Sequence, residues 1–252
     1  MSKLLFIETS TALCSTALAE NGRIISTRKS SEPRAHASLT AVFVKEMLDE
    51  AGWKVSDLDA VCVSKGPGSY TGLRVGVSTA KGLCFGGGVP LIAVDTLEIL
   101  AHQAIEAGLP DGCKAILPMV DARRMEVYTA VFSPTGERQT DISPVVLDET
   151  SFADLFASGP VVVIGDAAEK FAVLRGTSEP SATGKGPVCV PQGEPSTGIA
   201  RPHKSFRQTC PEASAMLVPA MAKFAKKEFE DVAYFEPFYL KQFIATTPKK
   251  LF

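Results

Sequence analysis

Short apolar runs alternate with polar turns at the start of the chain. Residues 3–8, 13–19 and 23–27 are apolar or β-branched, and Asn21-Gly22 separates the last two runs. An Asn-Gly pair between strand-like runs favours a tight hairpin, because both central residues of the turn need positive φ. The chain is therefore predicted to begin with a three-stranded antiparallel meander.

Helical periodicity follows the meander. Apolar residues recur every three or four positions over 36–51, 73–85 and 96–107, and compact strand-like runs occur at 59–64 and 91–94. Apolar residues at this spacing predict an amphipathic helix with one buried face. A short apolar run between two such helices predicts a buried strand. This order predicts an α/β fold in which a mixed sheet is covered by helices.

The second half of the chain predicts another α/β unit. Strands are expected at 114–120, 126–132 and 161–164, with a short helix at 151–157. Residues 175–208 are rich in Gly, Pro, Ser and Thr, and such a composition buries too little apolar surface to offset chain entropy. We therefore expect a mobile insertion at 175–208.

A last helix is predicted over 209–229, because Thr209 and Glu212 have capping-box spacing and Pro211 suits a first turn. The expected organisation is an N-terminal lobe at 1–108, on which the last helix packs back. A second lobe at 109–208 includes the insertion, and an irregular tail at 230–252 follows.

Composition and charge narrow the function classes. Twenty-six basic and twenty-eight acidic residues give a net charge of −2, and a protein that neutralises many phosphates alone normally carries a basic face. No apolar run approaches the roughly 20 residues of a membrane span, and the first run is too short for a signal peptide. We expect a cytoplasmic protein with no membrane partner and no nucleic-acid binding on its own.

Cysteine and histidine spacing argues against a metal centre. The six cysteines include no C-x-x-C pair, and Cys14, Cys62 and Cys84 lie in apolar segments, which is typical of buried free thiols. No histidine has a second histidine three or four residues away. A zinc site is therefore not expected.

Two polar stretches could carry chemistry. Glu8, Thr9, Ser10 and Thr11 follow the first strand and resemble the phosphate-binding hairpin of the actin/sugar-kinase/heat-shock ATPase superfamily, although a Thr replaces the expected small residue. A side chain at that position obstructs the approach of a phosphate. The alternative is an ordinary polar turn with capping hydroxyls.

The second stretch is glycine-rich and precedes a helix. Gly66, Gly68 and Gly72 could expose backbone amides to an anion at the helix N-terminus. The composition favours the alternative, in which the glycines permit a tight turn and close helix packing. The stretch is not a Walker A loop, because no Lys-Ser/Thr follows the last glycine.

An ordered set of motifs resembles the bacterial TsaB (YeaZ) family. Gly-Pro-Gly-Ser-Tyr-Thr-Gly-Leu-Arg at 66–74 is similar to its hallmark stretch, and 5–18 resembles its first hairpin. Residues 34–38, 121–128 and 237–241 are similar to its helix entry, its second-domain strand and its tail. The resemblance covers most of the chain outside roughly 138–210.

The resemblance implies a two-lobed ATPase-like fold, with mixed sheets flanked by helices, that has lost its catalytic machinery. Members of the family pair with the related TsaD, which binds ATP and metal, and with the ATPase TsaE. Together these proteins transfer a threonylcarbamoyl group to N6 of the adenosine next to the tRNA anticodon. A non-catalytic scaffold is thus implied, with no cofactor of its own and with tRNA contacted only through the complex.

The resemblance also implies a partner surface on the helices at 36–51 and 71–85. We expect this surface to pair with TsaD and to form a homodimer when the chain is alone, through outward side chains that include Val44 and Val77. The alternative is that these apolar residues form the protein's own core. The expected surface residues are Leu39, Thr40, Phe43, Val44, Met47, Leu73, Arg74, Val77, Ser78 and Lys81.

Two other function classes stay open from the residues alone. An active ATP-dependent small-molecule kinase or ATPase would use Glu8 and Asp95 as metal-facing acids. A metallopeptidase is the third hypothesis, and the absence of paired histidines gives it little support.

Overall fold

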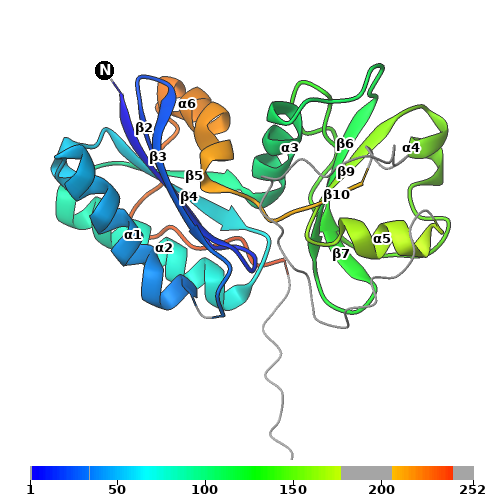
Figure 1. Ribbon diagram of the computed structural model, residues 1–252, viewed down its shortest axis with the longest axis horizontal. Coiled ribbons are helices and arrows are strands. Elements are labelled where there is room, and N and C mark those ends of the chain that lie inside the picture. Colours follow the sequence, from blue (N-terminus) through cyan, green and yellow to red (C-terminus); the bar gives the residue numbers. More distant parts are fainter. Residues whose placement is uncertain (1, 34, 177–205, 241–252) are drawn as a thin grey trace, which may run out of the picture.

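Two mixed sheets of five strands lie side by side, each flanked by helices (Figure 1). The computed structural model describes residues 2–33, 35–176 and 206–240. The predicted α/β fold with mixed sheets and flanking helices is confirmed.

The sheet of the first lobe has the strand order β3-β2-β1-β4-β5. The predicted meander is confirmed, because β1 pairs antiparallel with β2 and β2 with β3, whereas β4 and β5 add parallel strands beside β1. The strands are β1 (Lys3–Glu8), β2 (Cys14–Glu20), β3 (Arg23–Ser30), β4 (Ala60–Gly66) and β5 (Leu91–Asp95).

Helices cover both faces of this sheet. One face packs against α1 (Ala35–Ala51) and α2 (Tyr70–Gly87), and the short 3-10 helix η1 (Val55–Asp57) lies between α1 and β4 in the chain. The other face packs against the 3-10 helix η2 (Ala213–Met216) and α6 (Leu217–Lys226), which return from the C-terminal part of the chain. The first lobe is therefore built from both ends of the described chain.

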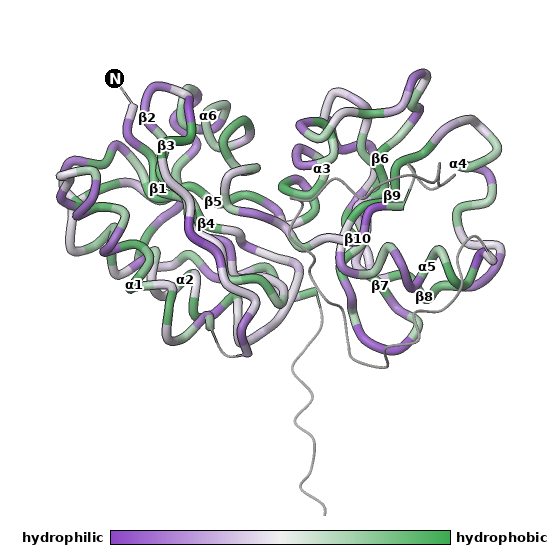
Figure 2. Tube along the Cα trace, viewed as in Figure 1, coloured by the Kyte–Doolittle hydropathy of each residue, from purple (hydrophilic) through white to green (hydrophobic). Residues whose placement is uncertain are grey.

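The second lobe has the strand order β10-β9-β6-β7-β8. Its central strands are apolar along their length (Figure 2), as expected for strands buried on both faces. Helix α3 (Thr96–Glu106) packs Leu97 and Leu100 against this sheet and Ile99 against the first lobe. The elements are β6 (Ala115–Asp121), β7 (Glu126–Thr129), β8 (Ser143–Val146), α4 (Ala153–Ala157), β9 (Val161–Gly165), α5 (Ala168–Leu174) and β10 (Phe206–Gln208).

The predictions for the C-terminal half need two corrections. Residues 206–208 are not part of a mobile insertion, because they form β10 beside β9; residues 177–205 lie outside the described residues. The last helix spans only 217–226, preceded by η2. The capping box does not form, because Glu212 instead pairs with Lys29 at 3.2 Å.

Two elements have no counterpart in the predictions. Strand β8 is an exposed edge strand, and α5 has only seven residues, so neither carries a long periodic pattern. Residues 231–240 contain no helix or strand, and those from 241 lie outside the described residues. No helix among the described residues is long and apolar enough to cross a membrane.

The cysteine prediction holds for Cys14, Cys62 and Cys84, which are buried free thiols. It is wrong for Cys210, which is disulfide-bonded. Spacing alone did not identify this residue, because the pairing of cysteines cannot be deduced from sequence.

Candidate functional site

The turn between β1 and β2 is tied to the first turn of α2. Glu8 ends β1 and is fully buried, and its Oε1 accepts a hydrogen bond from the Ser10 amide at 2.5 Å. The Thr9 hydroxyl donates to the Gly72 carbonyl at 2.8 Å, and the Ser69 amide donates to the Ser10 carbonyl at 2.6 Å. These bonds clamp the turn onto the helix.

Glycine permits this close contact. A Cβ added to Gly68 would come within 3 Å of the Ser10 carbonyl oxygen, and one added to Gly72 within 3 Å of the Thr9 carbonyl oxygen. Gly76, one turn further along α2, would likewise meet the Thr9 hydroxyl. Gly66 has a φ of +110°, which L side chains rarely adopt. The glycine-rich stretch is therefore required for the packing of α2 on the turn.

Part of the backbone of the turn is already engaged within the protein. A phosphate would need the backbone amides of the turn, yet the Ser10 amide is bonded to Glu8 and two turn carbonyls face α2. Asp95, the other candidate metal-facing acid, lies 3.5 Å from both Lys65 and Arg138. The described residues hold no group of three or more His, Cys, Asp or Glu suited to a metal ion.

Burial changes the acid–base behaviour of Glu8. Removal from water raises the pKa of its carboxyl from 4.5 to about 7, against the opposing effect of hydrogen bonds from Ser10, Ser64 and Thr9. A carboxyl in this position is partly protonated near neutral pH. It is a poor metal ligand there, because a metal binds the ionised form.

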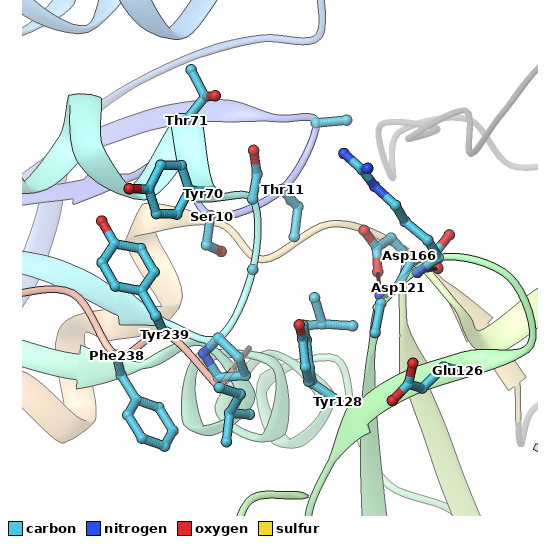
Figure 3. Close-up of a pocket in the computed structure, with 18 of the residues that line it drawn as sticks. Ser10, Thr11, Tyr70, Thr71, Asp121, Glu126, Tyr128, Asp166, Phe238 and Tyr239 are labelled. Atoms are coloured by element: carbon cyan, nitrogen blue, oxygen red, sulfur yellow. Dashed lines mark hydrogen bonds between the residues drawn. The ribbon is translucent and has the colours of Figure 1, made fainter. Parts of the chain in front are cut away.

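A cavity of about 780 Å³ lies between the two lobes. Figure 3 shows Ser10, Tyr70 and Tyr239 on the side of the first lobe, and Asp121 and Asp166 on the side of the second. The first lobe contributes the β1–β2 turn and the start of α2, and the second contributes the β6–β7 turn. A cleft between lobes that combines aromatic and charged groups is a typical ligand-binding position.

The C-terminal segment forms part of the cavity wall. Lys81 Nζ on α2 donates to the carbonyls of Ala233 at 3.1 Å and Phe235 at 2.9 Å. The Tyr239 ring lies 4.7 Å from the Tyr70 ring between centroids, and the Arg74 guanidinium lies over Tyr70. Arg74 and Lys81 therefore hold this protein's own C-terminal segment against α2.

Comparisons with known proteins identify the family. The family model described as TsaD, tRNA N6-adenosine threonylcarbamoyltransferase, matches residues 24–183. The tRNA threonylcarbamoyladenosine biosynthesis protein TsaB of Escherichia coli (strain K12) is 30% identical over 243 residues, which is 96% of each chain. The chain belongs to the TsaB family.

Solved structures agree with this assignment. YeaZ from Pseudomonas aeruginosa superposes with a TM-score of 0.71 and 29% identity, over 95% of this chain and all of that one. The two-lobed fold with mixed sheets flanked by helices, which the TsaB resemblance implied, is thereby confirmed. The chain also resembles tRNA N6-adenosine threonylcarbamoyltransferase of Sphingopyxis alaskensis, at 31% identity over 79% of this chain and 53% of that protein.

The TsaB-like surface predicted on α1 and α2 is partly wrong. Val44 and Val77 are only 3% and 4% exposed and belong to the core between these helices and the sheet, so neither faces outward. Three further residues of the predicted surface are also buried within the protein: Thr40, Met47 and Leu73. They lie on the helix stripe that covers the sheet, and amphipathic spacing alone cannot tell that stripe from a partner-facing one.

Other parts of the two helices do face solvent. Ser78 is exposed, and Leu39 and Phe43 are half-buried. Val42 is 44% exposed and Phe85 is 88% exposed, and neither was among the predicted surface residues. Both are apolar residues that lie outside the buried stripe of their helix. An apolar residue off the main stripe is visible in the helical spacing of the sequence, and this signal could have identified them.

We expect Gly72→Ala to destabilise the protein by several kcal/mol, because its Cβ would overlap the Thr9 carbonyl, a backbone group that has no room to move. Gly82→Ala in the same helix is the matched control. A Cβ there has open space, so this substitution should stabilise the helix by about 0.5–1 kcal/mol. Urea unfolding measures the free energy of unfolding of both variants. Equal changes in the two variants would contradict the requirement for glycine at position 72.

We expect Glu8→Gln to alter the pH dependence of stability. The folded protein retains the Glu8 proton up to about pH 7 and the unfolded chain loses it near pH 4.5, so wild-type stability falls as pH rises through this window. The shift corresponds to about 3 kcal/mol at most. Glutamine does not ionise, so Glu8→Gln should gain stability relative to the wild type between pH 5 and 8 in urea unfolding. Glu149→Gln, at an exposed position, is the control. If the unfolding free energies of the wild type and Glu8→Gln differ by the same amount throughout this pH range, the raised pKa of Glu8 is contradicted.

Proposed function

We propose that this protein acts as a non-catalytic subunit in the formation of threonylcarbamoyladenosine in tRNA. Membership of the TsaB family supports the pathway. The β1–β2 turn supports the non-catalytic role, because the Ser10 amide, which an ATPase hairpin would present to phosphate, donates to the Glu8 carboxyl instead. In this proposal the protein works in the cytoplasm and has no cofactor of its own.

The proposed partner is TsaD, with ATP and metal bound on that subunit. Similarity to a transferase over 79% of this chain supports a shared lobe structure. Two chains with related lobes can pair through equivalent helices, as the copies of a two-fold symmetric dimer do. TsaE would join this pair, and tRNA would be contacted through the assembled complex.

The proposed interface is the solvent-facing stripe of α1 and α2. Its exposed apolar members are Val42 and Phe85, beside the half-buried Leu39 and Phe43. Large exposed apolar residues on two neighbouring helices are a feature of protein–protein contacts when they form one patch. The same stripe would form a homodimer when TsaD is absent, so the two assemblies would compete.

The kinase or ATPase alternative is not favoured by the site. Glu8 is buried beneath the turn, and Asp95 lies between two basic side chains. The metallopeptidase alternative likewise gains no support from the described residues.

We expect the isolated protein to release no phosphate from ATP above background, because its hairpin cannot seat the nucleotide. In a reconstituted reaction with TsaD and TsaE, Glu8→Gln should support wild-type rates of threonylcarbamoyladenosine formation, measured by mass spectrometry of the tRNA nucleosides. Omission of the protein should lower that rate. Steady ATP turnover by the pure chain, lost in Glu8→Gln, would overturn the non-catalytic role.

We expect Val42→Glu and Phe85→Glu to keep the fold and to weaken both the homodimer and the TsaD complex, because a carboxylate in an apolar interface loses its hydration. Val44→Glu should unfold the chain, since its side chain is buried in the core. Val146→Glu is the control, because Val146 lies on β8 of the second lobe and is 70% exposed. This substitution should change neither the fold nor the pairing. Circular dichroism measures whether each variant folds, and sedimentation velocity measures whether it forms the homodimer and the TsaD complex. Normal pairing of Val42→Glu and Phe85→Glu would remove this stripe from the interface.

A further inference from the structure

The chain passes from one lobe to the other at two places within its described residues. The first crossing has no connecting loop, because β5 of the first lobe ends at Asp95 and α3 begins at Thr96. The second crossing consists of residues 209–212, which join β10 of the second lobe to η2 of the first. Movement between two lobes needs loop residues that absorb changes in φ and ψ. The mobility of the lobes therefore depends on these two segments.

Helix α3 lies at the junction of the lobes (Figure 1) and is buried on two sides. Leu97 and Leu100 belong to the core of the second lobe, and Ile99 belongs to a core cluster of the first. All three side chains are fully buried. A rotation of one lobe against the other would pull one of these apolar surfaces from its neighbours and expose it to water, which is unfavourable.

Gln103, near the C-terminal end of α3, ties this helix to the second crossing. Its Nε2 donates to Thr209 Oγ1 and to the Cys210 carbonyl, both at 3.2 Å, and its Oε1 accepts from the Glu212 amide at 3.1 Å. An amide side chain can do this because it carries both donors and an acceptor. One side chain thus bonds to three of the four residues of the second crossing and fastens the two crossings to each other.

The second crossing has little freedom of its own. The Thr209 amide donates to the last carbonyl of β9 at 3.2 Å, and both Thr209 and Cys210 are buried. The ring of Pro211 fixes its φ. The Glu212 carboxylate pairs with Lys29 of β3 at 3.2 Å. Each of the four residues is restrained, so this crossing does not supply a hinge.

An ion triad restrains the other end of α3. The Asp95 carboxylate lies 3.5 Å from Lys65 Nζ of the first lobe and 3.5 Å from a guanidinium nitrogen of Arg138 in the second lobe. The Asp95 side chain is only 13% exposed, so salt screens these pairs less than it screens pairs on an open surface. The carboxylate is shared between the lobes at the crossing that has no loop.

We propose that this junction is a brace that holds the two lobes at one fixed angle, with Gln103 as the positioning residue that locks the two crossings together. The ion triad restrains the start of α3, apolar contacts restrain its middle, and Gln103 restrains its end. A partner then meets a single rigid body, without closure of one lobe onto the other. The inference does not depend on the proposed role in tRNA modification.

Residual dipolar couplings of backbone amides, measured by nuclear magnetic resonance on the full-length protein, test the brace because they report the orientation of each lobe separately. We expect one alignment tensor to fit the amides of both sheets in the wild type. Gln103→Met keeps the length of the side chain but makes none of the three bonds, so the two sheets should then need different tensors. Two tensors in the wild type would overturn the proposal, and a single tensor in Gln103→Met would overturn the role of Gln103.

Gln208→Met is the matched control. The Gln208 amide also bonds to two backbone groups, the Asp166 carbonyl and the Glu169 amide, but both belong to the second lobe. This variant should lower the midpoint of thermal unfolding and keep the single tensor. Arg138→Gln removes one pair of the triad, so it should enlarge the difference between the tensors when combined with Gln103→Met. Loss of the shared tensor in Gln208→Met as well would show general destabilisation and would overturn the assignment.

Discussion

The contact between the first turn of α2 and the β1–β2 turn is the constraint on which the rest of the first lobe depends. Gly68 and Gly72 allow helix backbone to lie directly on the carbonyls of Thr9 and Ser10. The contact buries Glu8, and removal from water raises the pKa of its carboxyl. In the same turn the Ser10 amide donates to Glu8, which is the basis of the proposed non-catalytic role. The proposed loss of catalysis and the position of α2 have one physical origin.

The position of α2 also decides which residues can meet a partner. Once α2 lies on the turn, Val77 faces the sheet and packs with Val44 of α1. Arg74 and Lys81 are drawn to the C-terminal segment, where Lys81 bonds to two carbonyls. Val42 and Phe85 lie outside this packing and face solvent.

The cleft between the lobes joins these features. Its first wall is the β1–β2 turn with the start of α2, and its second wall is the β6–β7 turn held by Lys170. The segment that Lys81 holds contributes Tyr239 to the rim.

The sequence by itself determined most of the strands, the three long helices that precede residue 108, and the family. The Asn21-Gly22 turn, the helical spacing over 36–51 and the glycine-rich nonapeptide are local patterns, and local backbone preferences decide them. Tertiary structure alone decided that Val44 is core, that Cys210 is disulfide-bonded and that Glu212 pairs with Lys29 instead of capping a helix. It also brought Ser10 and Arg123 to one cavity from different lobes. Such contacts join residues far apart in the chain, and no local pattern specifies which face of an element will meet another.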